Sequence, residues 1–282
     1  MKILTFDIED WFHILDNPNT KDIAQWNAFE SRLQLGVDRI LNILNDRNLK
    51  ATFFILGWVG EKFPSVVKKI DSLGHHIGTH SYAHQLAYTQ SRQEFNLDLV
   101  KSLDILESIV GNKINAYRAP GFSIVEDNLW AFESLVENGI EIDSSIFPAG
   151  RAHGGLPNFS ESKPCLTKIL NKELKLFPIN SKEVMGRNFI YSGGGYFRLF
   201  PSFLLRNWFK NSDYVMTYFH PRDFDPEQPV LEGLSSFRRF KSYVGLGTSL
   251  KKLELILDEN KFISLDDADT LVDWENANKF KF

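Results

Sequence analysis

The sequence has almost no cysteine and no long apolar run, and each absence excludes a class of protein. Its 282 residues include one cysteine, Cys165, so a disulfide within the chain is excluded. Such usage fits a reducing compartment, and Cys165, which has no histidine beside it in sequence, is interpreted as structural. No stretch approaches the roughly 18 apolar residues that span a bilayer, so no transmembrane segment is expected.

The first residues also lack a secretory signal. A lysine is followed by a very short apolar run, residues 3–6, which meets Asp7 at once. A signal peptide needs a longer apolar stretch before its cleavage site. Together with the missing transmembrane segment, this pattern predicts a soluble protein of the cytoplasm.

Long runs of basic residues are missing as well. The formal net charge is −4, from 32 Lys and Arg against 36 Asp and Glu. The densest basic cluster is Arg238, Arg239 and Lys241, which we interpret as a solvated face. We expect no nucleic-acid partner, because no basic run is long enough to form a phosphate-binding patch. The sequence makes no prediction of oligomeric state.

What the sequence does contain is an alternation of short apolar runs and amphipathic stretches. Apolar runs predict buried strands, and apolar residues three and four apart predict helices. Strands are predicted at 3–6, 51–56, 76–80, 140–142, 214–219 and 262–265, and helices at 31–48, 63–73, 91–110, 126–138, 201–210 and 236–257. This alternation favours an α/β fold of roughly seven parallel strands joined by crossover helices.

A single domain is expected over residues 1–282. Within it, residues of about 147–200 are rich in Gly, Pro and Asn and include two runs of glycine. Such a composition is typical of loops and short strands. We therefore predict a loop-rich insertion there, within a barrel whose chemistry lies at the carboxyl ends of its strands.

The strongest chemical signal is a pair of histidines four residues apart. His80 and His84 follow a predicted strand. If the loop between them turns helically, both imidazoles lie on one face and reach one cation. Imidazole nitrogens bind zinc at about 2.0–2.1 Å. A histidine pair alone is modest evidence, because two solvated or capping histidines give the same pattern.

A second group consists of three acids, Asp7, Glu9 and Asp10, at the end of the first strand. Asp7 and Glu9 point to the same side if the strand continues. Like charges this close repel unless a cation or a proton relieves them. A polar loop at a strand end is the alternative interpretation.

Three further polar residues follow predicted strands. Arg118 can grip a carboxylate with two donors, Asp143 precedes two serines, and His220 ends the strand at 214–219. Each alone is more often structural than functional. Their shared position at successive strand ends makes a functional interpretation the better one.

The order of these blocks resembles the polysaccharide deacetylase family, which is the NodB-homology domain of carbohydrate esterase family 4. The matching blocks are TFDIED at 5–10, LGHHIGTHSYAH at 73–84, YRAPG at 117–121, IDSS at 142–145 and YFHP at 218–221. The resemblance covers about residues 3–221. It implies a distorted (β/α) barrel of the NodB-homology type, and hydrolysis of the N-acetyl group of an amino sugar.

The resemblance also implies a role for each matched residue. Asp7 is expected to be the catalytic base, and Arg118 to orient it. His220 is expected to be the catalytic acid, and Asp143 the acid that tunes it. His80 and His84 are expected to bind the metal ion.

The chain departs from the family in its first motif. The family often has two adjacent aspartates there, whereas here Ile8 separates Asp7 from Glu9 and Asp10. Some members have one residue between the catalytic base and the acidic metal ligand, and this pattern favours Glu9 as the ligand. Asp10 is the alternative. In the third motif Gly121 and then Phe122 follow proline, so the backbone donor to the oxyanion is left open.

The implied function is therefore that of a metal-dependent hydrolase. It would remove N-acetyl groups from an amino sugar in a polysaccharide or its precursor, with one divalent cation. Zinc is the expected ion, and cobalt and nickel are alternatives, since nitrogen and oxygen ligands accept each of them. The alternative functions are hydrolysis of another amide, such as a formyl group or a cyclic ureide, and an inactive carbohydrate-binding protein.

Three more histidines lie near these motifs. His75 and His76 are expected to support the metal ligands or to be structural. His13 follows two aromatic residues and is expected either to line the cleft or to lie on the surface.

Overall fold

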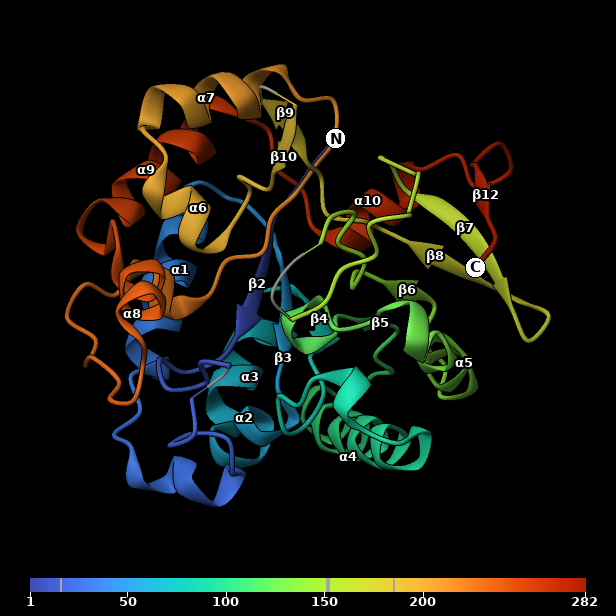
Figure 1. The fold of residues 1–282 in the computed structure, drawn as a ribbon, viewed down its shortest axis with the longest axis horizontal. Helices are drawn as coiled ribbons and strands as arrows, with labels where there is room; N and C mark the ends of the chain where they lie inside the picture. The colour runs from blue at the N-terminus through green and yellow to red at the C-terminus, as the bar shows by residue number, and fades with distance from the viewer. Residues whose placement is uncertain (16, 151–152, 185) are drawn as a thin grey trace.

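The computed structural model describes residues 1–15, 17–150, 153–184 and 186–282. Its centre is an eight-stranded sheet in the order β12-β7-β8-β6-β5-β4-β3-β2. Figure 1 shows this sheet running through the middle of the molecule, with helices packed outside it. The predicted α/β class with a mostly parallel sheet is confirmed.

Five strands form the parallel part of the sheet in sequence order. They are β2 (Thr5–Ile8), β3 (Thr52–Ile55), β4 (His76–Thr79), β5 (Ala116–Tyr117) and β6 (Ile142–Asp143). Each pairs with the next in a parallel register. Their side chains are almost all buried, which explains why they read as unbroken apolar runs rather than alternating ones.

The barrel is distorted because the β11 segment is paired along one side but only at one point on the other. On the paired side, β1 (Lys2–Ile3) lies parallel to β11 (Val215–Met216), and Phe6 forms a parallel bridge with Phe219. On the other side, the Met216 N–H donates to Asn180 Oδ1 at 2.9 Å. Further along the same side, Gly193 forms a single parallel bridge with Tyr218.

Helices cover the outer face of the parallel strands. They are α1 (Leu33–Asp46), α2 (Gly57–Lys62), α3 (Pro64–Ser72), α4 (Arg92–Val110) and α5 (Trp130–Glu137). Helix α4 begins with a capping box: Ser91 Oγ accepts from the Glu94 N–H, and the Glu94 carboxylate accepts from the Ser91 N–H. Short 3₁₀ turns lie at η1 (Ile23–Ala28), η2 (Ala87–Thr89), η3 (Pro120–Phe122), η4 (Glu126–Asn128) and η5 (Pro221–Phe224).

The expected loop-rich insertion contains more sheet than its composition suggested. Strands β7 (Cys165–Ile169) and β8 (Lys172–Leu176) form an antiparallel hairpin, and β8 also pairs with β6 in parallel. The short strands expected in this stretch thus include a hairpin that extends the central sheet, which the composition did not predict. Strands β9 (Lys182–Val184) and β10 (Arg187–Phe189) form a separate antiparallel pair. Cys165 is buried, as expected of a structural cysteine.

The rest of the chain is mostly helical. It contains α6 (Gly194–Leu199), α7 (Ser202–Asn211), α8 (Ser236–Tyr243), α9 (Leu246–Glu259), α10 (Leu265–Leu271) and the short strand β12 (Lys279–Phe280). The strand predicted at 262–265 is wrong, because Ile263 forms a single bridge and α10 begins at Leu265. Among the described residues, no helix combines the length and apolar character needed to cross a membrane.

Candidate active site

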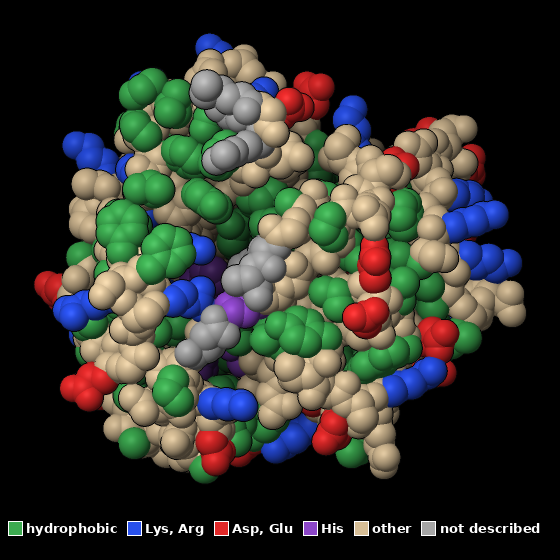
Figure 2. Space-filling model, viewed as in Figure 1, with side chains coloured by type: hydrophobic (Ala, Val, Ile, Leu, Met, Phe, Trp, Pro, Cys, Tyr) green, Lys and Arg blue, Asp and Glu red, His purple; other side chains and the backbone are tan. Residues whose placement is uncertain are grey.

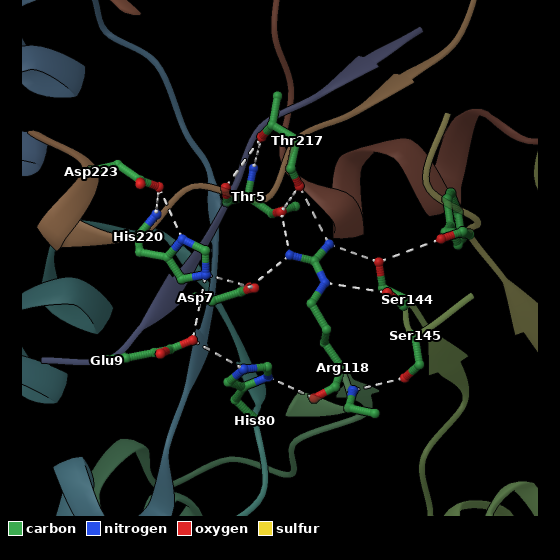
Figure 3. A network of polar contacts seen from close by, with 12 residues as sticks. Thr5, Asp7, Glu9, His80, Arg118, Ser144, Ser145, Thr217, His220 and Asp223 are labelled. Carbon is green, nitrogen blue, oxygen red and sulfur yellow. Dashed lines mark hydrogen bonds and ion pairs between the residues drawn. The ribbon is translucent and has the colours of Figure 1, made fainter. Parts of the chain in front are cut away.

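The predicted polar residues converge where the parallel strands end. Asp7 lies in β2 and Glu9 directly follows it. His80 follows β4, Arg118 follows β5 and His220 follows β11, and Figure 3 shows these residues around one centre. A cavity of about 680 Å³ opens over them. In Figure 2 histidine side chains are visible in the hollow at the centre of this face.

Glu9, His80 and His84 form a compact group of potential metal ligands. Their ligand atoms all lie within 4.8 Å of one another. Glu9 Oε1 is 3.2 Å from His84 Nε2 and 3.6 Å from His80 Nε2. All three side chains are buried. Burial opposes ionisation of Glu9, but the nearby His84 and His220 hold its pKa well below the usual range.

The hydrogen bond on the far side of His80 prepares its ring for a cation. His80 Nδ1 lies 2.7 Å from the carbonyl oxygen of Arg118. A carbonyl can only accept, so Nδ1 carries the hydrogen and Nε2 presents its lone pair towards Glu9. Metal-binding histidines are oriented by this kind of outer contact. The donor set of one carboxylate and two imidazoles therefore fits a divalent cation.

The loop from His80 to His84 brings its histidines together without a helical turn. Ser81 and His84 have φ of 65° and 52°, so the expected helical geometry is wrong. The half-buried Asp98 of α4 fixes this loop by accepting from the N–H groups of Tyr82 and Ala83 at 2.8 and 2.9 Å. Sequence reasoning missed Asp98, because nothing in a helical pattern marks one acid as a partner of a distant loop.

Arg118 holds Asp7 in a fixed orientation. Its side chain is fully buried, and its Nη1 donates to Asp7 Oδ1 and to Thr5 Oγ1, both at 2.7 Å. Its Nη2 and Nε donate to the hydroxyl and the carbonyl of Ser144 at 2.9 and 3.2 Å. With its donors held on both sides, the guanidinium cannot rotate away from Asp7 (Figure 3). The structure thus places Arg118 where the expected role needs it.

His220 lies between the acids of β2 and a third carboxylate, that of Asp223. Its Nε2 is 3.5 Å from Glu9 Oε1 and 3.9 Å from Asp7 Oδ2, and its Nδ1 is 2.9 Å from Asp223 Oδ2. Burial disfavours the charged ring, but Glu9 and Asp223 outweigh it and raise the pKa of His220 to about 9. His220 therefore carries its proton at neutral pH.

Asp223 is itself held by a buried arginine. Arg198 Nε lies 3.2 Å from Asp223 Oδ1, and both side chains are almost fully buried. Despite burial, Arg198 and His220 lower the pKa of Asp223 to about 2. Sequence reasoning missed both residues. For Asp223 the available signal was its position three residues after His220. For Arg198 there was no such signal, because it lies in the stretch that was expected to form loops.

The expected role of Asp143 is corrected by these contacts. Asp143 does not reach His220; its two carboxylate oxygens accept from the N–H and the hydroxyl of Ser145 at 2.9 and 2.6 Å. Ser145 Oγ in turn accepts from the Ala119 N–H at 2.8 Å. Burial raises the pKa of Asp143 to about 7. Through Ser145, Asp143 therefore supports the turn that follows Arg118.

Asp10, the rival metal acid, points away from the histidines. Its carboxylate accepts from the Ser31 hydroxyl, from the Arg32 N–H at 3.1 Å and from the Trp11 N–H at 2.9 Å. These groups precede α1, so Asp10 ties the end of β2 to the start of that helix. Asp10 is therefore not positioned to bind the same cation as the histidines, whereas Glu9 is.

The three histidines whose roles the sequence left open, His13, His75 and His76, have separate fates. His13 is buried and lines the cavity, and the Asp10 N–H donates to its Nδ1 at 3.1 Å. His75 Nδ1 accepts from the Ala51 N–H at 3.3 Å, and His76 contacts the Thr52 hydroxyl. Both lie at the amino end of β4, away from the cluster, and are structural.

The third-motif turn offers one backbone group to the cavity. Gly121 lines the cavity with φ of 61°, and a Cβ there would meet Leu15 and Leu86 at 2.8 and 2.9 Å. The next N–H, that of Phe122, donates to the carbonyl of Ala119 at 3.0 Å. That donor is therefore already used within the turn, which leaves the N–H of Gly121 as the candidate for the oxyanion.

A distorted parallel barrel with a carboxylate and two histidines at its strand ends defines the class of NodB-type barrel proteins. More narrowly, residues 17–139 match the model of the polysaccharide deacetylase family, so the chain carries a domain of that family. Residues 144–270 match a second model, described as a domain of unknown function (DUF3473). The first segment contains His80, His84 and Arg118, and the second contains Arg198, His220 and Asp223.

Curated relatives match part of the chain. A peptidoglycan-N-acetylglucosamine deacetylase from Bacillus cereus is 40% identical over 96 residues, which are 34% of this chain and 35% of the relative. A peptidoglycan-N-acetylmuramic acid deacetylase from Bacillus subtilis is 26% identical over 103 residues, 36% of this chain and 39% of the relative. The chain thus spans little more than a third of the length of these relatives.

Solved structures confirm the fold over almost the whole chain. A Mycobacterium smegmatis protein assigned to the polysaccharide deacetylases superposes with a TM-score of 0.68 at 17% identity, covering 99% of this chain and 92% of that one. A family 4 carbohydrate esterase from Streptomyces lividans, in complex with acetate, has a TM-score of 0.50 at 11% identity, with coverage of 93% and 90%. The distorted barrel of the NodB type is therefore the fold of this protein.

Proposed function

We propose that this protein is a metal-dependent N-deacetylase of amino sugars. The observation that carries the proposal is the arrangement of an arginine-held carboxylate, Asp7, and a histidine, His220, beside a Glu-His-His ligand group. Hydrolysis of an amide needs a base for the attacking water and an acid for the departing amine, and these must be separate groups. The names of the curated relatives, which are deacetylases, support the same reaction.

Glu9, His80 and His84 would hold the cation. A divalent cation there supplies Lewis-acid chemistry, since it lowers the pKa of water from 15.7 towards about 7 and polarises an amide carbonyl. Zinc is the first candidate, because a carboxylate and two imidazoles are common zinc ligands, and cobalt or nickel would be accepted by the same donors.

Asp7 would act as the base through its Oδ2. Its Oδ1 is engaged by Arg118 at 2.7 Å, whereas Oδ2 faces His220 and the cavity. Oδ2 would accept the proton of the water that attacks the acetyl carbon. Because Arg118 fixes the carboxylate, the base needs no rearrangement at the moment of attack.

His220 would act as the acid through its Nε2. Its Nδ1–H donates to Asp223, so the second proton of the imidazolium lies on Nε2, which faces Asp7 and Glu9. The carboxylates of Glu9, Asp223 and Asp7 raise the pKa of His220, which favours the protonated ring. Nε2–H would protonate the nitrogen of the sugar as the bond to the acetyl carbon breaks.

The substrate class follows from the cavity and from the relatives together. The relatives' names specify N-acetylglucosamine and N-acetylmuramic acid units of peptidoglycan. A cavity of about 680 Å³ is large enough for a drug-sized ligand and hence for more than one sugar unit. We propose an N-acetylated amino sugar within a polysaccharide or its precursor as the substrate, and a cytoplasmic site of action stays a prediction.

The decisive experiment measures acetate release from N-acetylated glucosamine oligomers by the zinc-loaded protein. His220→Gln and Asp7→Asn should each retain zinc and lose roughly 10²–10⁴ in turnover, as expected for loss of a general acid or base. Asp10→Asn is the matched control, since Asp10 lies outside the ligand group, and it should keep both zinc and turnover.

Other results would contradict the proposal. Unchanged turnover in Asp7→Asn would remove this carboxylate from the chemistry. Formate or an opened ureide as the product, with no acetate, would select the other amide hydrolases. Tight glycan binding without any product would indicate a carbohydrate-binding protein.

A further inference from the structure

An apolar surface that the proposed reaction does not use lies beside the mouth of the cleft. It is formed by α6, α7 and α8, and we call it the α6–α8 rim. Its exposed side chains are Tyr196, Leu199, Phe203, Phe237 and Phe240. Phe203 is 68% exposed, Phe237 69% and Phe240 54%. Figure 2 shows hydrophobic side chains gathered over these helices, next to the hollow that contains the histidines.

These side chains are too many and too close together to be incidental. Single exposed apolar residues are common on protein surfaces, but clusters mark binding surfaces. Burial of one phenylalanine is worth about 1.5–3 kcal/mol, so several phenylalanines left in water forgo considerable free energy. Four of the five, all except Phe203, also line the cavity. The apolar surface is thus continuous with the entrance to the site.

The two chain segments that form the rim carry charged residues of one sign. Residues 184–212, which include α6 and α7, contain no Asp or Glu, and neither do residues 233–253, which include α8. These two segments together contain nine Lys and Arg, in a chain whose net charge is −4. Some of these cations are internal, such as Arg198, but Arg239, Lys241 and Lys210 are exposed. The rim is therefore basic on a molecule that is acidic as a whole.

Helix α8 combines both properties on one short element. Its sequence, Ser236–Tyr243, carries Phe237 and Phe240 three residues apart, and hence on one side, together with Arg238, Arg239 and Lys241. The Lys241 ammonium lies 5.6 Å from the centre of the Phe237 ring. Aromatic residues beside Lys and Arg on an amphipathic helix are typical of helices that lie in a membrane interface.

We propose that the α6–α8 rim docks on an anionic lipid bilayer, with the mouth of the cleft next to the lipid surface. Phenylalanine and leucine side chains enter the boundary between headgroups and acyl chains, and the exposed cations contact anionic headgroups. A glycan strand is the weaker candidate for the occupant. Phe203 lies outside the cavity lining, and Leu199 offers a sugar neither a hydrogen bond nor an aromatic ring. Docking would favour substrates presented at a membrane.

The test is co-sedimentation of the whole chain with vesicles, in the absence of substrate. Vesicles of phosphatidylcholine with one quarter phosphatidylglycerol should bind the protein at low salt, and pure phosphatidylcholine should bind it much less. The double variant Phe203→Ser with Phe240→Ser should weaken binding roughly tenfold or more, because it removes two rings that enter the lipid boundary. Separately, Arg239→Glu should weaken it at least about fivefold, because it removes an interfacial cation and adds a negative charge.

Matched control variants change exposed apolar and cationic side chains outside the α6–α8 rim. Leu97→Ser with Leu271→Ser deletes two side chains that are 61% and 68% exposed on α4 and α10, and Lys168→Glu reverses a charge on β7. These variants should bind vesicles as the original chain does. Thermal unfolding of every variant shows whether it is folded.

Three results would overturn the proposal. They are absence of binding to anionic vesicles, equal binding to both lipid compositions, and equal weakening by the control variants. Binding to a soluble N-acetylated glycan that the rim variants abolish, without vesicle binding, would assign the rim to the polysaccharide. Because the assay contains no substrate, its outcome is independent of whether the protein releases acetate.

Discussion

Asp223 is the single residue that most directly affects the proposed acid, His220. Asp223 contacts His220 Nδ1 at 2.9 Å and contributes to raising the pKa of His220. Asp223→Asn removes that charge, so His220 should lose its proton at a lower pH. The alkaline limb of the profile of kcat/KM against pH should therefore shift to lower pH, with a loss of about tenfold or more in rate at pH 8.

Asp143→Asn is the matched control for this shift. Asp143 is equally buried but bonds to Ser145 rather than to His220. Its variant should keep the alkaline limb at the original pH. An identical limb in Asp223→Asn and in the unchanged chain would mean that Asp223 does not tune the acid.

Asp143 should also leave a signature in the pH dependence of stability. Its folded pKa is raised to about 7, chiefly by burial, whereas an unfolded aspartate has a pKa of about 3.9. Between these values the folded chain holds a proton that the unfolded chain has lost. Stability therefore falls as the pH rises from about 4 to about 7, and the loss is complete above the folded pKa.

In Asp143→Asn that contribution should be absent. Thermal unfolding between pH 5 and pH 8 should show a smaller decline for this variant than for the unchanged chain. The full shift corresponds to a few kcal/mol at most, roughly 1.4 kcal/mol per pKa unit. Two parallel curves of unfolding midpoint against pH would show that Asp143 is ionised throughout.

Sequence reasoning identified which types of residue take part, but not which of two neighbouring acids does so. Asp7, Arg118 and His220 lie where the family motifs imply. Glu9 could not be separated from Asp10, because Asp10 is drawn away by Ser31 and Arg32, some twenty residues along the chain. Likewise the partner of His220 depends on the position of a distant arginine, which no local pattern reveals.

Among the secondary-structure elements, the loop between β4 and α4 determines whether the histidines meet. Asp98 accepts from the N–H groups of Tyr82 and Ala83 at 2.8 and 2.9 Å. Asp98→Ala leaves those donors without this acceptor, so the loop should loosen. Zinc affinity measured by calorimetry should fall about 10–100-fold, as is typical when residues that orient metal ligands are lost.

Asp104 provides the control on the same helix. It is an exposed acid of α4, and Asp104→Ala should leave zinc affinity unchanged. If Asp98→Ala binds zinc as tightly as the control, the geometry of the loop does not depend on this carboxylate.

Elements with a strong period were predictable, and those defined by long-range pairing were not. Helix α4 was predicted within one residue, because its capping box and its apolar spacing agree. The β7–β8 hairpin lies in a stretch with many polar residues, and its place beside β6 is set by pairing across more than thirty residues. Residues 262–265 read as a strand, yet Ser264 caps α10 and ends that pattern.

For the whole molecule, the barrel brings together groups from both ends of the chain. Asp7 and Glu9 precede the segment that matches the deacetylase family, and His220 lies in the segment that matches the domain of unknown function. The parallel pairing of β1 with β11 joins the two. The proposed base and acid therefore meet only in the assembled barrel. One domain over residues 1–282 stays a prediction.

A cation held by this site should stabilise the whole fold, and that linkage separates Glu9 from Asp10. A ligand that binds only the folded state adds about 2.7 kcal/mol at 100 times its Kd, which corresponds to several degrees in Tm for a chain of this size. Zinc should therefore raise the Tm of the unchanged chain. In Glu9→Gln the rise should vanish, because the ligand group loses its charge. Asp10→Asn should start from a lower Tm, since the tie to α1 is weakened, yet show the full rise. The opposite pattern, with the rise lost in Asp10→Asn and kept in Glu9→Gln, would move the metal site to Asp10 and away from His80 and His84.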